Sequence, residues 1–275
     1  MCIRDSYQFD LWVVKWIPDT DSQTSHLRLT NVYRNSKADG SRLMRGKLES
    51  NELSQLQSVR NFTGERSAQY WLTPFLGALV AGEAKKQDQV LKLLERIDNQ
   101  LSLAIVSQRE ASFAILSGDE VSMRSIGSVI EELKEPSGTR FEHYWFQKLE
   151  YILWRERNRF GKYDAVKLAA YRITSKNSIE HVHPQREEFG VELDKEHLDS
   201  FGNLVLLSPG ENSSYSNQRV GKKREDFKGK PRYDSLKLAH IFSGKDGMEW
   251  SESAIGLHQR KMLALIQKHY ETAGT

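Results

Sequence analysis

The order of the apolar segments in the C-terminal half limits the fold of this chain more than any other feature of its sequence. Ser178–Val182 predicts a short strand, which Pro184 ends because proline has no N–H group to donate to a β-ladder. Leu204–Leu207 is apolar throughout and predicts a second, buried strand. A turn at Ser208–Gly210 then precedes a helix that we expect to begin near residues 212–213. The predicted order is strand, long loop, strand and helix.

Four polar residues accompany these two strands, and their side chains suit the hydrolysis of a phosphodiester. His181 is a candidate general base, because an unperturbed histidine has a pKa of about 6.5 and is largely neutral in the cell. Glu180 and Asn212 offer oxygen ligands of the kind that Mg²⁺ prefers. Asn203 begins the second strand. Its amide both donates and accepts, so we expect it to tie the loop to the strands and to hold the His181 backbone.

Glu180 and His181 are neighbours in the sequence, which limits how both side chains can serve one site. Neighbouring residues on a regular strand point to opposite faces. The two side chains therefore share a site only where the strand twists or breaks, and Pro184 gives a reason for a break there. The other histidine of this segment, His183, is interpreted as structural, because a single histidine near a strand end usually is.

Charge is unevenly distributed, although the net charge of the 275 residues is only +3. Residues 186–199 carry six acids and two bases, and residues 219–237 carry eight bases and three acids. A basic segment directly after the motif suits the phosphate backbone of a nucleic acid. Within it, Lys222, Lys223 and Arg224 are expected to lie one to three turns into the predicted helix and to contact flanking phosphates. A solvated helix face is the alternative.

The N-terminal half is predicted to be mostly helical. Two apolar stripes at helical spacing indicate the core of a helical bundle; they consist of Val90, Leu94, Ile97 and Leu101, and of Phe141, Trp145, Leu149 and Ile152. A last helix is expected from about Ser253 to Tyr270. Residues 8–35 alternate loosely and predict a hairpin with a turn at Pro18-Asp19, and residues 36–46 predict a loop.

Composition favours a cytoplasmic protein without a membrane span. The longest nearly apolar run, Trp71–Gly82, has only twelve residues, which is too short to cross a bilayer. The N-terminus has no pattern of a secretory signal. Cys2 is the single cysteine, so we expect neither an internal disulfide nor a structural zinc site built from cysteines. The opening Met1–Ser6 resembles an adventitious start, and we expect the chain to be part of a longer protein.

Residues 171–275 resemble the HNH nuclease domain, of the ββα-metal type, at the C-terminus of GmrSD-type modification-dependent restriction endonucleases. The resemblance rests on IEHVHPQ at Ile179–Gln185, FGNLVLLS at Phe201–Ser208 and NSSYSN at Asn212–Asn217. It continues at single positions, namely Lys223, Tyr233, Ser235, Trp250, Ile255 and Arg260.

The resemblance implies a role for each residue of the motif. His181 is the general base, and Glu180 and Asn212 hold a single Mg²⁺ or Mn²⁺ ion. Asn203 takes the middle position of the HNH name, with a mainly structural role in the catalytic group. Asn217 and Lys223 support the metal-binding helix or the phosphate. The implied partner is DNA, including modified foreign DNA, in a restriction and phage-defence system.

The chain departs from the family pattern at several points. Glu180 stands where many HNH nucleases carry aspartate, His183 replaces an aliphatic residue, and Val220 stands where we expect an aromatic one. The Asp-Gly-Gln-Gln-Arg signature of the family's N-terminal nucleotide-hydrolysing domain does not occur in the sequence. A separate or preceding nucleotide-hydrolysing domain is therefore an expected partner.

The predicted fold is α+β, with a mostly helical N-terminal region followed by a ββα-metal nuclease domain. The expected boundaries are an unassigned segment or hairpin at 1–60, a helical bundle at 61–170 and the nuclease domain at 171–275. The predicted function is metal-dependent DNA cleavage. Two alternatives stay open: an inactive domain of the same fold that binds nucleic acid through residues 219–237, and a nuclease that acts on RNA.

Overall fold

The structure is a computed structural model that describes residues 3–18, 25–35, 42–64, 68–160, 163–185, 193–215, 217–243 and 250–273. Its contacts divide the chain into two compact units, one of residues 1–123 with the last three residues and one of residues 124–272. The division falls inside the segment 61–170 that the sequence indicates as one helical region. Across the described residues, no helix combines the length and the apolar character needed to cross a membrane.

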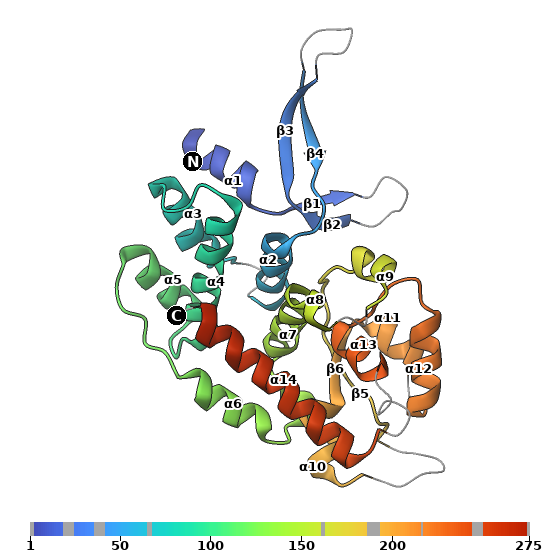
Figure 1. Cartoon of the computed structure of the whole chain (residues 1–275). Coiled ribbons are helices and arrows are strands. Elements are labelled where there is room, and N and C mark those ends of the chain that lie inside the picture. Colours follow the sequence, from blue (N-terminus) through green and yellow to red (C-terminus); the bar gives the residue numbers. More distant parts are fainter. Residues whose placement is uncertain are drawn as a thin grey trace. The chain divides into compact units, whose positions relative to one another are not determined.

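The first unit joins two antiparallel strand pairs to a group of helices (Figure 1). In chain order its elements are α1 (Ile3–Trp12), β1 (Lys15–Pro18), β2 (Ser25–Arg28), β3 (Thr30–Asn35), β4 (Arg42–Lys47), α2 (Glu52–Thr63), α3 (Leu72–Ala81), α4 (Gln87–Leu103) and α5 (Gln108–Ser117). The four apolar residues predicted to form a stripe on α4 are all buried, which confirms that prediction.

The N-terminal strands only partly follow the sequence-based expectation. A hairpin is confirmed for β1 and β2, but Phe9 and Leu11 lie on the helix α1 and not on a strand. The predicted loop at 36–46 is wrong for residues 42–46, because β4 pairs with β3 from Thr30↔Lys47 to Asn35↔Arg42. Both strands expose most of their side chains, so no buried face marks them in the sequence. Asp19 and residues 36–41, including Asp39-Gly40, lie outside the described residues.

The second unit is mostly helical and contains one short antiparallel strand pair (Figure 1). Its elements are α6 (Ile126–Lys134), η1 (Gly138–Arg140), α7 (His143–Arg155), α8 (Arg157–Phe160), α9 (Ala165–Ala170), β5 (Ser178–His181), α10 (Lys195–Leu198), η2 (Phe201–Asn203), β6 (Leu204–Leu207), α11 (Pro209–Tyr215), α12 (Val220–Gly229), α13 (Leu236–Ser243) and α14 (Glu252–Ala273). With its small two-stranded sheets and many helices, the chain has the α+β class that the sequence predicts.

The two predicted strands of the C-terminal half are confirmed as β5 and β6. They pair in antiparallel register from Ser178↔Leu207 to His181↔Leu204. All four residues of β6 are buried, because α7 packs against this strand and Val205 and Leu207 join a core cluster with residues of α12 and α13. Burial on both faces explains why β6 is apolar throughout.

The helix after β6 begins at Pro209, earlier than expected. Ser208 and Glu211 form a reciprocal cap: the Ser208 main-chain N–H donates to Glu211 Oε2 at 2.8 Å, and the Glu211 N–H donates to Ser208 Oγ at 3.3 Å. Proline fits the first helical position because its missing N–H would have no partner there. The Ser-Pro-Gly-Glu segment is therefore the start of α11 and not a separate turn.

Glu150 on α7 is the buried group that fixes α13. Its carboxylate accepts hydrogen bonds from the Leu236 and Lys237 main-chain N–H groups, at 2.6 and 3.1 Å, at the helix N-terminus. It also accepts from the hydroxyls of Ser235 and Tyr171, at 2.5 and 2.6 Å. A carboxylate at this end of a helix also interacts favourably with the helix dipole.

Replacing Glu150 with alanine is expected to lower the free energy of unfolding by at least about 3 kcal/mol, because several buried donors lose their acceptor. Urea unfolding followed by tryptophan fluorescence measures the change. Glu131→Ala is the matched control, since Glu131 is exposed and, among the residues that the structure describes, pairs only with Lys134; it should change stability by less than about 0.5 kcal/mol. Equal effects of the two substitutions would contradict the assigned role of Glu150.

Candidate functional site

Asn203 is fully buried at the end of η2, directly before β6, and joins three segments of the second unit. Its Oδ1 accepts from the His183 main-chain N–H and from Trp250 Nε1, both at 2.9 Å. Its Nδ2 donates to the Leu198 carbonyl at 2.9 Å and to the His183 carbonyl at 3.4 Å. The side chain thus ties the exit of β5, the end of α10 and the segment before α14 to one point.

The backbone that Asn203 holds is that of His183, two residues beyond the position expected from the sequence. The main chain of Asn203 extends the pairing of β5 and β6 by one residue, because the Val182 N–H donates to the Asn203 carbonyl at 2.8 Å. The chain then bends at Val182 and His183. His181 is therefore the last residue of β5, and the following bend is fixed by hydrogen bonds to a buried amide.

His181 is buried, and its ring is oriented by Asp199. The His181 Nε2 atom lies 3.0 Å from Asp199 Oδ1, and the side chain of Asp199 is only 19% exposed. An ionised carboxylate only accepts hydrogen bonds, so the ring carries a proton on Nε2. In the neutral ring, Nδ1 is then the nitrogen that can take up a proton.

Asp199 is not predicted as a member of this group, because in the sequence it is one of six acids in residues 186–199. In the structure its carbonyl accepts from the Gly138 N–H at 2.9 Å, which joins the end of α10 to η1. Gly138 has a φ of +56°, and a Cβ atom there would lie 3.1 Å from Asp199 Oδ1. The positive φ and this close approach both favour glycine.

Glu180 has a different partner from His181. Lys223 of α12 places its Nζ 2.7 Å from Glu180 Oε1 and also donates to the His181 carbonyl at 2.6 Å. Burial lowers the pKa of Lys223, and the neighbouring Glu180 opposes that shift. Lys223 is only 2% exposed, so it does not present its ammonium to an external phosphate as the sequence-based hypothesis assumed.

Asn212 lies on the same face of β5 as Glu180. Its Nδ2 donates to Ser178 Oγ at 2.7 Å, and Ser178 and Glu180 are two residues apart on the strand. Among the described residues, Asn212 Oδ1 and Glu180 Oε2 have no hydrogen-bond partner. One amide oxygen and one carboxylate oxygen are the hard ligands that Mg²⁺ or Mn²⁺ takes, so these residues fit such an ion in kind.

Strand alternation places His181 on the face of β5 opposite to Glu180 and Asn212. The structure therefore brings the two candidate oxygen ligands to one face and gives the candidate base a separate position beside Asp199. β5 ends at His181, and the chain bends directly after it. His183 is also buried, and its Nδ1 lies 3.1 Å from the Pro184 carbonyl.

The basic residues after the motif are distributed differently from the expectation of one continuous helix. α11 ends at Tyr215 and α12 begins at Val220, with the exposed Asn217 between them. Lys222 is exposed and pairs with Asp226 at 2.7 Å, whereas Arg224 Nε donates to the Phe242 carbonyl at 3.1 Å. The exposed bases of the segment 219–237 are Arg219, Lys222, Lys228 and Arg232.

A second group of potential metal ligands lies in the same unit. The ligand atoms of Asp194, His197 and Glu252 lie within 4.8 Å of one another. Asp194 also caps α10, since its Oδ1 accepts from the His197 N–H at 2.7 Å and lies 2.8 Å from His197 Nδ1. The group contains no cysteine, and its residues lie in the acidic segment and at the start of α14, far apart in the sequence.

These features define a small α+β domain with paired strands, a following helix, and polar groups at the end of the first strand. Residues 131–265 match the family model of the C-terminal domain of GmrSD restriction endonucleases. This segment of the chain is a member of that domain family, which confirms the resemblance seen in the sequence. No curated protein and no solved structure matched the chain.

Lys237 of α13 binds the main chain on both sides of Asn203. Its buried ammonium donates to the Leu204 carbonyl at 2.6 Å and to the Phe201 carbonyl, and it lies 4.0 Å from the centre of the Phe201 ring. Burial lowers the pKa of Lys237 to about 7, and Glu150 acts in the opposite direction. An unfolded lysine titrates near 10.5, so the folded state binds fewer protons between these two values.

Stability is therefore expected to rise between pH 7 and pH 9, by about 2 kcal/mol from Lys237 alone. Urea unfolding at several pH values should show this rise in the wild type and not in Lys237→Met. Lys222→Met is the control and should run parallel to the wild type, because Asp226 raises the pKa of the exposed Lys222. A Lys237→Met curve with the same slope as the wild type would disprove the assignment.

Proposed function

We propose that this chain hydrolyses phosphodiester bonds of DNA in a metal-dependent reaction, as the nuclease part of a restriction system. The observation that carries the proposal is the arrangement around β5, with a carboxylate and an amide oxygen on one face and an oriented histidine on the other. Membership of residues 131–265 in a domain family of restriction endonucleases supports the substrate class.

His181 is the proposed general base. Its Nδ1 takes the proton of the attacking water, while Asp199 holds the proton of Nε2 and stabilises the imidazolium that forms. Asp199 is a positioning residue, because it acts through the ring. The hydrogen bonds of Asn203 fix the bend after His181 and so determine where the ring lies.

Glu180 and Asn212 are the proposed ligands of the metal ion. A bound Mg²⁺ or Mn²⁺ ion supplies positive charge to the transition state of phosphodiester hydrolysis. Ser178 orients the Asn212 amide so that its oxygen is available. Lys223 pairs with one Glu180 oxygen and with the His181 carbonyl, and it therefore holds the carboxylate on the strand.

The substrate phosphate is proposed to lie at the end of β5, where the chain bends directly after His181. The exposed bases Arg219, Lys222, Lys228 and Arg232 offer contacts for the flanking backbone. Asn217 lies between α11 and α12, directly after the helix that contains Asn212. Arg224 is held by its hydrogen bond to the Phe242 carbonyl of α13. Of the residues predicted to contact DNA, the exposed Lys222 is therefore the most suitable.

Nicking of supercoiled plasmid by the full chain with Mg²⁺ or Mn²⁺ tests the catalytic role. His181→Ala is expected to reduce the rate by about 10²–10⁴-fold, since a general base contributes that much. His183→Ala is the matched control, because Asn203 binds only the main chain of His183, and it should keep most of the activity. Thermal melts of both variants establish that they fold.

The outcome of the same assay decides between the proposal and its two alternatives. If wild type and His181→Ala bind DNA equally and neither cuts it, the domain is a binding module. Labelled RNA offered in parallel with unmodified and base-modified DNA tests the substrate. Faster cleavage of RNA than of either DNA would overturn the DNA assignment.

Asp199→Asn keeps an oxygen that accepts from Nε2 but removes the negative charge beside the ring, whereas Asp199→Ala removes both. We expect kcat to fall about 10-fold or more in Asp199→Asn and further in Asp199→Ala, with KM for DNA unchanged. A rise in KM with unchanged kcat would show that Asp199 acts on binding and not on the base.

A further inference from the structure

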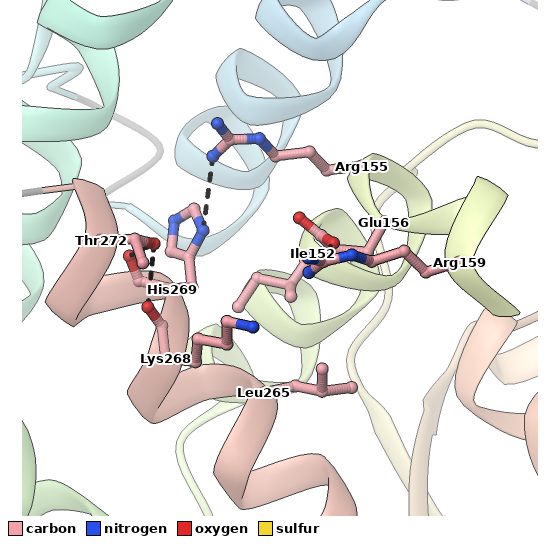
Figure 2. A pocket seen from close by; sticks show the side chains of 8 residues that line it. All are labelled: Ile152, Arg155, Glu156, Arg159, Leu265, Lys268, His269 and Thr272. Atoms are coloured by element: carbon pink, nitrogen blue, oxygen red, sulfur yellow. Dashed lines mark hydrogen bonds and ion pairs between the residues drawn. The ribbon is translucent and has the colours of Figure 1, made fainter.

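A pocket of about 370 Å³ lies between α7 and α8 on one side and the last turns of α14 on the other (Figure 2). Its size is within the range of small-molecule sites. Side chains of α14 face those of α7 and α8 across the cavity. No residue of the proposed nuclease site lines it.

The lining is basic. It contains three basic residues, Arg155, Arg159 and Lys268, and one acid, Glu156. Glu156 is already engaged, because Arg159 Nη1 lies 2.6 Å from its Oε2. The Lys268 ammonium has no hydrogen bond or ion pair with any residue that the structure describes. The pocket therefore has a positive balance that its own residues do not neutralise.

Arg155 is fixed in orientation at the pocket wall by His269. Its Nη1 lies 3.5 Å from His269 Nδ1 (Figure 2). His269 is 6% exposed. A guanidinium only donates, so the His269 Nδ1 accepts and the neutral ring carries its proton on Nε2. The histidine ring is itself packed edge-on against Tyr151, with the ring centres 5.9 Å apart. A planar guanidinium held in this way suits the oxygens of a phosphate group.

Apolar side chains complete the wall. Ile152 is 1% exposed, and Leu265 is half-buried on the facing side of α14. Such surfaces reduce the access of water and so strengthen the attraction between the bases and an anion. A multiply charged anion that accepts several hydrogen bonds fits this combination better than an apolar ligand does.

We propose that this pocket binds a phosphate group, with Arg155 and Lys268 as its two main contacts. The source is either a free phosphorylated anion or a phosphate of DNA. The proposal is independent of the nuclease chemistry, because the pocket shares no residue with it.

Calorimetric titration of the full chain with inorganic pyrophosphate tests the proposal. The titration is carried out in EDTA, so that a metal at the nuclease site does not contribute. We expect saturable binding that weakens at least 10-fold in Lys268→Gln. Lys261→Gln removes the same charge from an exposed position of the same helix and should bind like the wild type. His181→Ala should also bind pyrophosphate like the wild type, so that a failure of the proposed nuclease function would not change this result.

A second titration with a short 5′-phosphorylated DNA duplex distinguishes the two sources. Saturable pyrophosphate binding that depends on Lys268 indicates a free anion. Loss of duplex affinity in Lys268→Gln, without saturable pyrophosphate binding, indicates a DNA phosphate. The proposal is overturned if Lys268→Gln changes neither titration, or if Lys261→Gln weakens both to the same extent.

Discussion

The hydrogen bonds of the Asn203 side chain are the interaction on which the rest of the site depends. This buried amide binds the main chain of His183, the carbonyl of Leu198 and the indole of Trp250. Each buried donor or acceptor left without a partner costs about 1–3 kcal/mol, so the three segments are held together at one place. The end of β5, the position of Asp199 directly after Leu198, and the start of α14 all follow from this anchor.

The hydrogen bonds of Asn203 also bear on the separate roles that we propose for Glu180 and His181. Glu180 and His181 lie on opposite faces of β5, and each has its own partner, Lys223 for the carboxylate and Asp199 for the ring. A strand that continued regularly would keep these faces apart. Because Asn203 holds the bend directly after His181, β5 ends there, and this end is the proposed position of the substrate phosphate.

The sequence predicts those parts of the structure that depend on local pattern. The stripes on α4 and α7 and the strands β5 and β6 follow from apolar spacing. The pair of β3 and β4 does not, because its exposed side chains show no alternation. Asp199 and the burial of Lys223 could not be predicted either, since their partners lie 18 and 43 residues away and meet them only in the folded chain.

Binding of Mn²⁺ measured by electron paramagnetic resonance tests the division of tasks between the two faces of β5 most directly. The measurement is best made in a His197→Ala background, which removes one residue of the second potential ligand group. We predict that Glu180→Gln loses bound Mn²⁺ and that His181→Ala retains it, although both variants cleave DNA much more slowly than the wild type. Unchanged Mn²⁺ binding in Glu180→Gln, or its loss in His181→Ala, would contradict the account.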